Sequence, residues 1–365
     1  MDRAQGSTES LRHKCAACFR QFNKMEHLVE HMKTYYHSTH EPICDICKKH
    51  CRFYDSLRGH LIGPLPKAEC AKRFSERGCS LCLKVFPTAE QLTYHRATCQ
   101  SLPPLPPISG GRLFSVNNRI QAETEQIHGE SSNRGNISAI AMDCEMVGGG
   151  QDGSLDICAR VCLVDEEEKV VFHCYVNPTI PITDYRYDVS GIKPEHLIDA
   201  MPLKQVQEKI QQILYNGEAI WRIRSKGGKA KVLVGHGLDH DLQSLSMEYP
   251  NHLIRDTAKY IPLLKSSKAS NSLKYLTQSF LGYKIQSSTH DPYEDCVSAM
   301  RIYKKMRNQD HSQSASLSVG EFHPENVVYA RMKHKDLEKM TPETLLQISQ
   351  SDFYCWCMDS NSQAT

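Results

Sequence analysis

A pattern of cysteines and histidines that repeats three times within residues 1–100 is the strongest constraint on how this chain can fold. In each repeat two residues separate a pair of cysteines, and a histidine follows after twelve more. This is the ligand spacing of a tetrahedral zinc site. A unit of this size buries too little apolar surface to fold alone, so the metal would supply much of its folding free energy. We therefore expect three small zinc-bound units, near 15–37, 44–70 and 79–99.

The three repeats differ in their last ligand. In chain order, the expected zinc ligands are Cys15, Cys18, His31 and His37, then Cys44, Cys47, His60 and Cys70, then Cys79, Cys82, His95 and Cys99. In the second repeat Cys70 follows a Gly-Pro-Leu-Pro stretch, and His50 and Cys51 are competing ligands. The array resembles C2H2-type ββα zinc fingers, two of which end in cysteine. Reduced cysteines that are merely buried are the alternative, but three copies of one spacing argue against it. We expect two or three zinc ions.

The head of the chain, residues 1–100, also differs from the rest in charge. It carries 16 Lys and Arg against 10 Asp and Glu, together with 9 of the 16 cysteines. Excess positive charge favours sequence-tolerant contact with nucleic acid; the alternative is an array that binds protein or is purely structural. No apolar run reaches the length of a membrane span and no secretory signal is evident, so we expect reduced cysteines and no membrane association. The expected location is the nucleus, with the nucleolus and the cytosol as alternatives.

Three further segments follow the head. Residues 101–136 are rich in Pro, Gly, Ser and other polar residues, which predicts a linker. Residues 137–308 alternate between strand-like and helix-like apolar patterns, which predicts an α/β domain with a mixed sheet flanked by helices. Its first three strands should be antiparallel because a short acidic turn joins two of them. A tail over 309–365 should contain a short helix around 342–348, and its Cys355-Trp356-Cys357 has no role that the sequence explains.

Two carboxylates on the first predicted strand indicate a site for a divalent cation. Asp143 and Glu145 are two residues apart, so they point to the same face and repel each other unless a cation neutralises them. A solvated strand face is the alternative for such a pair. A second group follows the buried strand that ends at Gly235, where Asp241 is the better ligand candidate and Asp239 would serve as a helix N-cap.

A third group surrounds a predicted helix start at Asp291-Pro292, with Asp291 as the N-cap and Glu294 completing a capping box. His290 then precedes the cap and Asp295 is the fourth helical residue. These two positions pack together in capped helices, so an imidazole and a carboxylate should lie close to one another. An incidental histidine beside a capped helix is the alternative.

Taken in order, Asp-x-Glu, Gly-His-x4-Asp and His-x4-Asp resemble the three motifs of the DEDDh superfamily of 3′→5′ exonucleases. The first motif, Met-Asp-Cys-Glu-Met-Val-Gly, resembles that of the eukaryotic RNA-exonuclease branch. This branch includes ribosomal-RNA-processing, apoptosis-enhancing and interferon-induced nucleases. Plant members of that branch carry zinc fingers ahead of the domain. The resemblance implies an RNase H-like fold and a metal-dependent phosphodiester hydrolase that releases nucleoside 5′-monophosphates from a 3′ end.

The resemblance also implies a role for each residue of the site. Four carboxylates would bind two Mg²⁺ or Mn²⁺ ions: Asp143, Glu145, Asp241 and Asp295. His290 would act as the base that activates water. Met146 would stack on the terminal base or pack in the core, and His236 is a further candidate for substrate contact. RNA is the expected substrate and single-stranded DNA the alternative; the rival function is a zinc-finger nucleic-acid-binding regulator with an inactive exonuclease-like domain.

A basic stretch from Trp221 to Lys231 is a further candidate for substrate contact. It holds five Lys and Arg and no acidic residue, and Trp221 could stack on a base. The alternative is a solvated loop whose tryptophan is anchored in the core.

Overall fold

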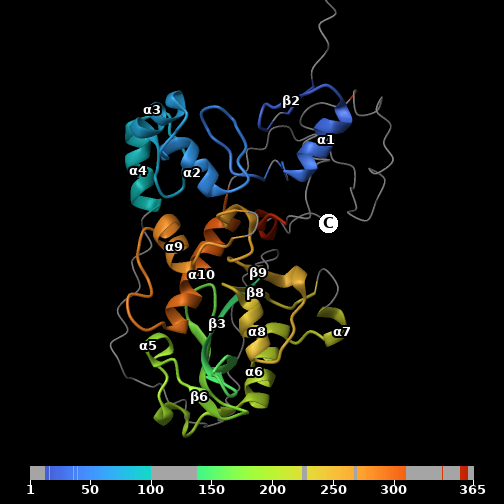
Figure 1. Cartoon of the computed structure of the whole chain (residues 1–365), viewed down its shortest axis with the longest axis vertical. Coiled ribbons are helices and arrows are strands. Elements are labelled where there is room, and N and C mark those ends of the chain that lie inside the picture. Colours follow the sequence, from blue (N-terminus) through green and yellow to red (C-terminus); the bar gives the residue numbers. More distant parts are fainter. Residues whose placement is uncertain are drawn as a thin grey trace, which may run out of the picture.

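The computed structural model describes residues 13–99 apart from 16, 36 and 39, residues 138–309 apart from 224–227 and 267–268, residue 339, and residues 354–360. The linker predicted at 101–136 and the helix predicted at 342–348 lie outside these residues. Figure 1 shows the head and the α/β domain as two neighbouring lobes, with the last described residues on the side of the α/β domain that faces the head. No helix in the described ranges is both long and apolar enough to cross a membrane.

The sheet of the α/β domain is organised around strand β3 (Ala139–Gly149). This strand pairs antiparallel with β4 (Leu155–Val164), which pairs antiparallel with β5 (Val170–Asn177). On its other side β3 pairs parallel with β8 (Val232–Gly235), and β8 pairs parallel with β9 (Ile254–Asp256). The antiparallel arrangement of the first three strands confirms the prediction from the short acidic turn.

Two short strands extend this sheet. Strand β6 (Ile182–Asp184) pairs with the end of β3, and β7 (Met201–Pro202) pairs parallel with β5. The remaining helical turns of the domain are α5 (Tyr187–Ser190), η1 (Pro194–Leu197), α7 (Ile220–Ile223), η2 (Asn251–Leu253) and η3 (Ile261–Leu263). The sheet order β7-β5-β4-β3-β8-β9, with helices packed on both faces, confirms the predicted RNase H-like mixed α/β fold.

Alternation along β3 separates the two faces of the sheet. Ala141 belongs to an apolar cluster with α10 (Pro292–Arg307), whereas Met142 belongs to a second cluster with α6 (Leu203–Tyr215) and α8 (Leu238–Ser244). Because side chains two residues apart share a face, the next odd-numbered positions of β3 also face α10. The two acidic residues of this strand occupy those positions.

Residues 273–281 have helix-like apolar spacing but do not form a regular α-helix. The first turn of this segment is α9 (Leu273–Leu276), capped by the Ser272 hydroxyl, and the segment continues as a π-helical turn, η4 (Thr277–Leu281). The turn ends at Gly282, whose φ of 84° lies in the left-handed region that glycine tolerates. Apolar spacing alone does not distinguish the two kinds of turn, and this π-turn forms part of a contact surface for the head.

The head contains α1 (Met25–Thr34), α2 (Tyr54–Ile62), α3 (Ala68–Arg77) and α4 (Ala89–Cys99), and strands β1 (His13–Lys14) and β2 (Gln21–Phe22) precede α1. The turn after each cysteine pair is the same in all three repeats. Phe19, Lys48 and Leu83 have φ values of 65°, 60° and 61°, and each donates its amide N–H to the carbonyl of the first cysteine. The sequence repeat is therefore a structural repeat.

The second finger packs directly against the α/β domain. Tyr54, at the start of α2, meets the ring of Phe280 edge-on with a centroid distance of 5.3 Å. Arg58 donates to the carbonyl of Ser279 at 3.2 Å, and Asp55 accepts from the hydroxyl of Tyr275 at 2.8 Å. The start of α2 is the part of a zinc finger that would read bases. In this chain it is engaged by η4 and α9 instead.

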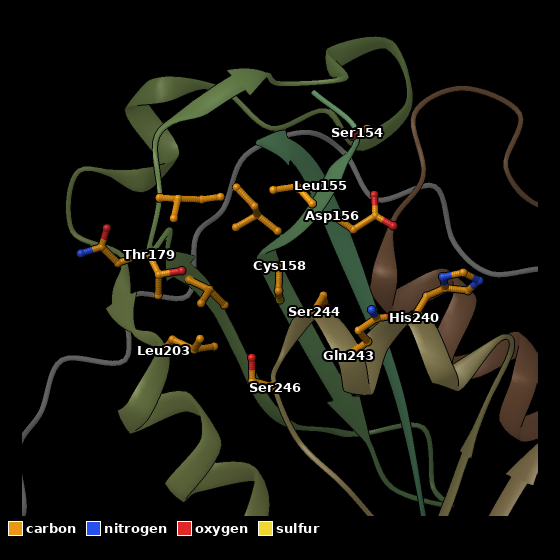
Figure 2. Close-up of a pocket in the computed structure, with 14 residues that line it drawn as sticks. Ser154, Leu155, Asp156, Cys158, Thr179, Leu203, His240, Gln243, Ser244 and Ser246 are labelled. Carbon is orange, nitrogen blue, oxygen red and sulfur yellow. The ribbon is translucent and has the colours of Figure 1, made fainter. Parts of the chain in front are cut away.

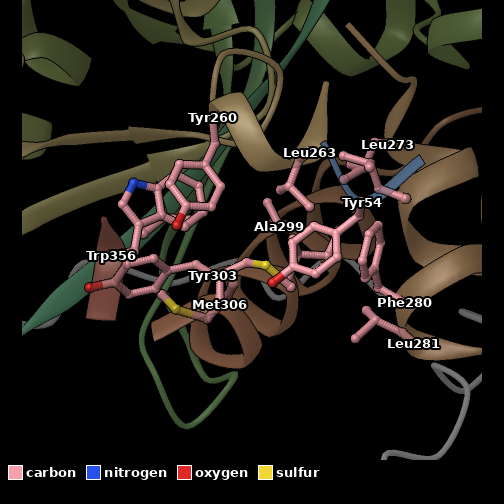
Figure 3. Packing of buried hydrophobic residues seen from close by; sticks show 14 of the residues in the cluster. Tyr54, Tyr260, Leu263, Leu273, Phe280, Leu281, Ala299, Tyr303, Met306 and Trp356 are labelled. Carbon is pink, nitrogen blue, oxygen red and sulfur yellow. The ribbon is translucent and has the colours of Figure 1, made fainter. Parts of the chain in front are cut away.

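The last described segment, residues 354–360, also packs on the α/β domain. Trp356 stacks on Tyr260 with a ring distance of 3.9 Å and meets Tyr303 edge-on, as Figure 3 shows. Asp359 is fully buried and accepts two hydrogen bonds from Arg255, at 2.7 and 2.8 Å. The segment includes a short helix, η6 (Trp356–Asp359). Its aromatic and ionic contacts make it part of the core.

The two tryptophans of the chain should therefore differ sharply when replaced. Trp356→Ala removes a side chain that is 4% exposed and should lower the free energy of unfolding by about 3–5 kcal/mol. Trp221→Ala removes one that is 77% exposed and should change it by about 0.5 kcal/mol or less. Urea titration of both full-length variants measures the difference. Equal losses for the two variants would contradict the packing of Trp356.

Candidate active site

Three segments of the α/β domain bring the predicted carboxylates to one end of the sheet. Asp143 and Glu145 lie on β3, on the face covered by α10, and Asp295 lies in the first turn of α10. Asp241 lies in the first turn of α8, which follows β8. Glu145, Asp241 and Asp295 are 4–5% exposed, and Asp143 is half-buried. Buried carboxylates without a charged partner are costly, so this grouping calls for a cation.

Within this group three residues lie closest together. Ligand atoms of Glu145, His290 and Asp295 are all within 4.8 Å of one another. Asp143 and Asp241 lie outside this set of three. The charges of Asp295, Asp241 and Glu145 nevertheless all act on Asp143, which places the four carboxylates in one electrostatic unit.

The structure also separates the roles of the neighbouring aspartates on α8. Gly237, with φ of 79°, lies at the N-cap of this helix and turns the chain sharply away from the end of β8. Asp241 points inward and accepts a hydrogen bond from the amide of Cys144 on β3, at 2.9 Å. Asp239 is exposed and pairs with Lys259 at the surface. Only Asp241 of the two shares the site.

Burial raises the pKa values of all four carboxyl groups, and repulsion from the other members of the group adds to it at Asp143 and Glu145. Burial is the largest cause in each case, and it raises the pKa of Glu145 to about 8 and that of Asp241 and Asp295 to about 7. The pKa of Asp143 lies well above its usual range for the same reason, with Asp295 as the second cause. In the metal-free protein these carboxyl groups would be protonated near neutral pH. A bound divalent cation would keep them ionised.

The donor set fits such a cation. Asp295 Oδ2 accepts from the Gln286 side-chain amide at 2.8 Å, while its buried Oδ1 has no hydrogen-bond partner. A buried oxygen of this kind, beside the carboxylate of Glu145, is a natural ligand for a hard divalent ion. Gln286 was not predicted as a site residue because it lies nine residues before Asp295 in an irregular segment.

His290 lies beside this cluster at the start of α10. Its amide donates to the carbonyl of Val189 at 2.8 Å, which fixes the backbone next to α5. Burial and the charge of Lys274 lower the pKa of His290 below its usual value, so the ring is neutral and able to accept a proton near pH 7. Asp291 caps α10 by accepting from the amide of Tyr293, as predicted. Glu294 does not complete a capping box; it accepts from the amide of Gln286 instead.

Arg160 is a site neighbour that sequence patterns did not reveal. It lies directly opposite Glu145 in the register of β3 and β4, and its positive charge lowers the pKa that burial would otherwise raise further. Its guanidinium also donates to His173 at 2.8 Å and approaches Asp291 at 3.4 Å. Only the cross-strand register, which follows from the turn between the strands, could have identified it.

The two predicted substrate contacts have partners outside the group of carboxylates. Met146 follows a bulge in β3 and packs, half-buried, against the cluster under α6 and α8. His236, also half-buried, donates from Nδ1 to the hydroxyl of Thr257 at 2.9 Å, and that hydroxyl donates to the carbonyl of Gly235. Trp221 is exposed rather than anchored in the core.

A pocket of about 380 Å³ lies on the other side of α8 (Figure 2). Asp156 and Cys158 of β4 line it, together with His240 and Gln243 of α8 and Leu203 at the start of α6. None of the five candidate catalytic residues is among its lining residues. The chemistry is therefore expected at the carboxylate cluster and not in this pocket.

In the head, the predicted zinc ligands form three groups. Each group has its four ligand atoms within 4.8 Å of one another: Cys15, Cys18, His31 and His37; Cys44, Cys47, His60 and Cys70; and Cys79, Cys82, His95 and Cys99. The sulfur–nitrogen separations are 3.1, 3.4 and 3.1 Å, close to the edge of about 3.5 Å that a tetrahedral zinc site has. In the second group the structure selects Cys70, while His50 donates to the carbonyl of Ser38.

Comparison with known proteins agrees with this geometry. A family model described as Exonuclease matches residues 140–303, the segment that contains all five candidate residues. We call this segment the exonuclease domain after the family that it resembles. The resemblance implies the use of a divalent metal, which is consistent with the raised pKa values of the carboxyl groups.

Relatives of the exonuclease domain carry the name RNA exonuclease 4. The mouse protein is 36% identical over 206 residues, which is 56% of this chain and 43% of that protein. The protein of Saccharomyces cerevisiae is 37% identical over 172 residues, covering 47% of this chain and 55% of that protein. The chain thus spans about half the length of these relatives. A solved Pan2 catalytic unit of Neurospora crassa aligns with 25% identity and a TM-score of 0.39, covering 52% of this chain and 30% of that one.

Replacing Asp239 and Asp241 of α8 one at a time tests which of them contributes to the site. Asp241→Asn should lower nuclease activity by about two to three orders of magnitude, the scale of losing one charge-stabilising group. Asp239→Asn should keep activity within about twofold, because it only breaks an exposed ion pair. Initial rates on a labelled oligonucleotide measure both. A larger loss for Asp239→Asn would shift the assignment by two residues.

The raised carboxyl pKa values predict an unusual dependence of stability on pH. In unfolded chains these groups ionise near pH 4, but in the folded exonuclease domain they hold protons up to about pH 7–8. Without Mg²⁺ or Mn²⁺, the melting temperature should therefore fall as the pH rises from about 5 to about 8, because the folded state then holds protons that the unfolded state has already lost, and it should level off above about pH 8.

Added Mg²⁺ or Mn²⁺ should raise the melting temperature, and by more at the upper end of this range, because the cation binds the ionised cluster. The variant Glu145→Gln should reduce both the pH dependence and the response to the cation. Differential scanning fluorimetry on zinc-loaded protein measures these shifts. A response to Mg²⁺ that is the same at both ends of the pH range would contradict the prediction.

Proposed function

We propose that the chain is a metal-dependent 3′→5′ exonuclease of the DEDDh type that removes nucleoside 5′-monophosphates from RNA. The observation that carries the proposal is the convergence of Glu145, His290 and Asp295 within 4.8 Å, beside Asp143 and Asp241. The names of the RNA exonuclease 4 relatives support RNA as the substrate class. Single-stranded DNA is the alternative, and the assay below distinguishes the two.

Four carboxylates would hold two Mg²⁺ or Mn²⁺ ions: Asp143, Glu145, Asp241 and Asp295. When bound, these ions would favour the ionised form of the attacking water and offset charge on the leaving 3′ oxygen. Hydrogen bonds and strand pairing within the chain fix the orientation of these carboxylates. The Cys144 amide orients Asp241, the Gln286 amide orients Asp295, and the β3–β4 register places Arg160 opposite Glu145.

His290 would accept the proton of the attacking water. Three observations support this role: the imidazole lies within 4.8 Å of two of the carboxylates, its lowered pKa keeps it neutral near pH 7, and its backbone is held by Val189. A neutral imidazole next to ionised carboxylates gains stability as it becomes protonated. Met146, which follows Glu145 in the sequence, and His236, directly after β8, would contact the terminal nucleotide.

The three ligand groups of the head would each hold one zinc ion. Because α2 packs on α9 and η4, the second finger would join the two lobes, and its helix start would not read bases. Contact with RNA would then fall to the first and third fingers, helped by the positive charge of the head. A protein partner is the alternative for these two fingers. We expect the protein to act in the nucleus.

A degradation assay tests the proposed function directly. Purified full-length protein is incubated with RNA and DNA oligonucleotides labelled at the 3′ or the 5′ end, with and without Mg²⁺ or Mn²⁺. We expect early release of a labelled mononucleotide from 3′-labelled RNA, a ladder from 5′-labelled RNA, and neither product without the cation. The matched control is Glu145→Gln, which should be inactive. Folded protein with no activity on any substrate would favour the binding regulator instead.

A further inference from the structure

A fourth group of cysteines and histidines lies outside the three fingers and outside the exonuclease site. Ligand atoms of His40, Cys355 and Cys357 are all within 4.8 Å of one another. The closest pair is Cys357 Sγ and His40 Nδ1, at 3.4 Å, from residues 317 positions apart in the chain. His40 lies in the short connection between the first and second fingers, and the two cysteines flank Trp356 in the C-terminal segment.

The dimensions of this group match those of the fingers. Its sulfur–nitrogen separation equals the 3.4 Å between Cys47 and His60 in the second finger. Cysteines also occur in β3, β4, β5 and α10, but within the described part of the chain none of those belongs to a group of this kind. Chance burial of cysteine does not explain why two thiols and an imidazole meet where distant segments cross.

The contacts of the neighbouring residues fix the two cysteines in place. Trp356 stacks on Tyr260, and Asp359 is bound by Arg255 and by the Tyr303 hydroxyl at 2.8 Å. Cys355 and Cys357 are 3% and 6% exposed. The C-terminal segment is thus anchored on the exonuclease domain mainly through Trp356 and Asp359. Cys355 Sγ also lies 3.6 Å from the Tyr260 hydroxyl, and Cys357 Sγ lies 3.4 Å from His40 Nδ1.

We propose that His40, Cys355 and Cys357 form a fourth zinc site, separate from the fingers, with its fourth position taken by water or another small ligand. Two thiolates and an imidazole are the ligands that zinc prefers. Two thiolates also balance the charge of Zn²⁺, so the bound site is neutral, as a largely buried location requires. Mg²⁺ and Ca²⁺ prefer oxygen ligands and would not bind here.

The site would join three parts of the molecule. Each finger joins ligands within 21 to 27 consecutive residues. This site instead ties the connection between the first two fingers to the C-terminal segment, and through that segment to the exonuclease domain. It would therefore fix the first finger relative to the active site. The second finger already has its own contacts with α9 and η4, so the main effect falls on the first.

Zinc content of the full-length protein tests the proposal. The protein is purified under reducing conditions, and gel filtration removes loosely bound metal. The number of zinc ions per chain is then measured by inductively coupled plasma mass spectrometry. His40→Asn and the double variant Cys355→Ser/Cys357→Ser should each contain one zinc fewer than the unmodified chain. Cys174→Ser, which removes a half-buried cysteine outside all four groups, should lose none.

The two site variants remove ligands that lie far apart in the sequence, so each variant tests the same zinc site independently. The proposal stands only if both lose a single equivalent; an unchanged zinc content, or the loss of more than one equivalent, overturns it. A disulfide between Cys355 and Cys357 in the intact mass of the native protein would also overturn it. Trp356 and Asp359 anchor the segment without metal. The fluorescence emission of Trp356 should therefore remain typical of a buried indole in both variants.

Discussion

The burial of acidic side chains at one end of the sheet is the constraint on which the exonuclease domain depends. Alternation along β3 directs Asp143 and Glu145 toward α10, and the sharp turn after β8 brings Asp241 to the same end of the sheet. Folding these groups together as anions costs free energy, which protonation or a bound cation offsets. The geometry that would hold a metal for catalysis therefore lowers the stability of the fold most when the groups are ionised and no cation is bound.

The head and the exonuclease domain share an apolar cluster, so they are not simply two modules on a tether. Tyr54 and Leu57 of α2 lie in the same cluster as Phe280 and Leu281 of the π-helical turn. An element that in other fingers reads bases here serves as an internal contact. The orientation of the fingers toward the carboxylates is consequently built into the fold, and an isolated exonuclease domain would expose the apolar side chains of η4.

Much of this arrangement could be predicted from sequence, because it follows from local rules. Metal-ligand spacing gave the ligand groups, period-two alternation placed Asp143 and Glu145 on one face, and the capped helix start placed His290 beside Asp295. Long-range contacts could not be predicted in this way. Three features depend on how separate elements meet in space: the selection of the predicted ligand Cys70 over the competing His50 and Cys51, Arg160 opposite Glu145, and the tail on Tyr260. The short strand β9 was missed because three residues carry too little pattern.

The docking of residues 354–360 has a consequence for synthesis on the ribosome. A chain is made from its N-terminus, and domains generally fold as they emerge. Here the sheet and α10 emerge well before Trp356, so the rings of Tyr260 and Tyr303 and the guanidinium of Arg255 await partners from residues 354–360. A nascent chain that has not yet released these residues from the ribosome would present this uncovered surface to chaperones and proteases.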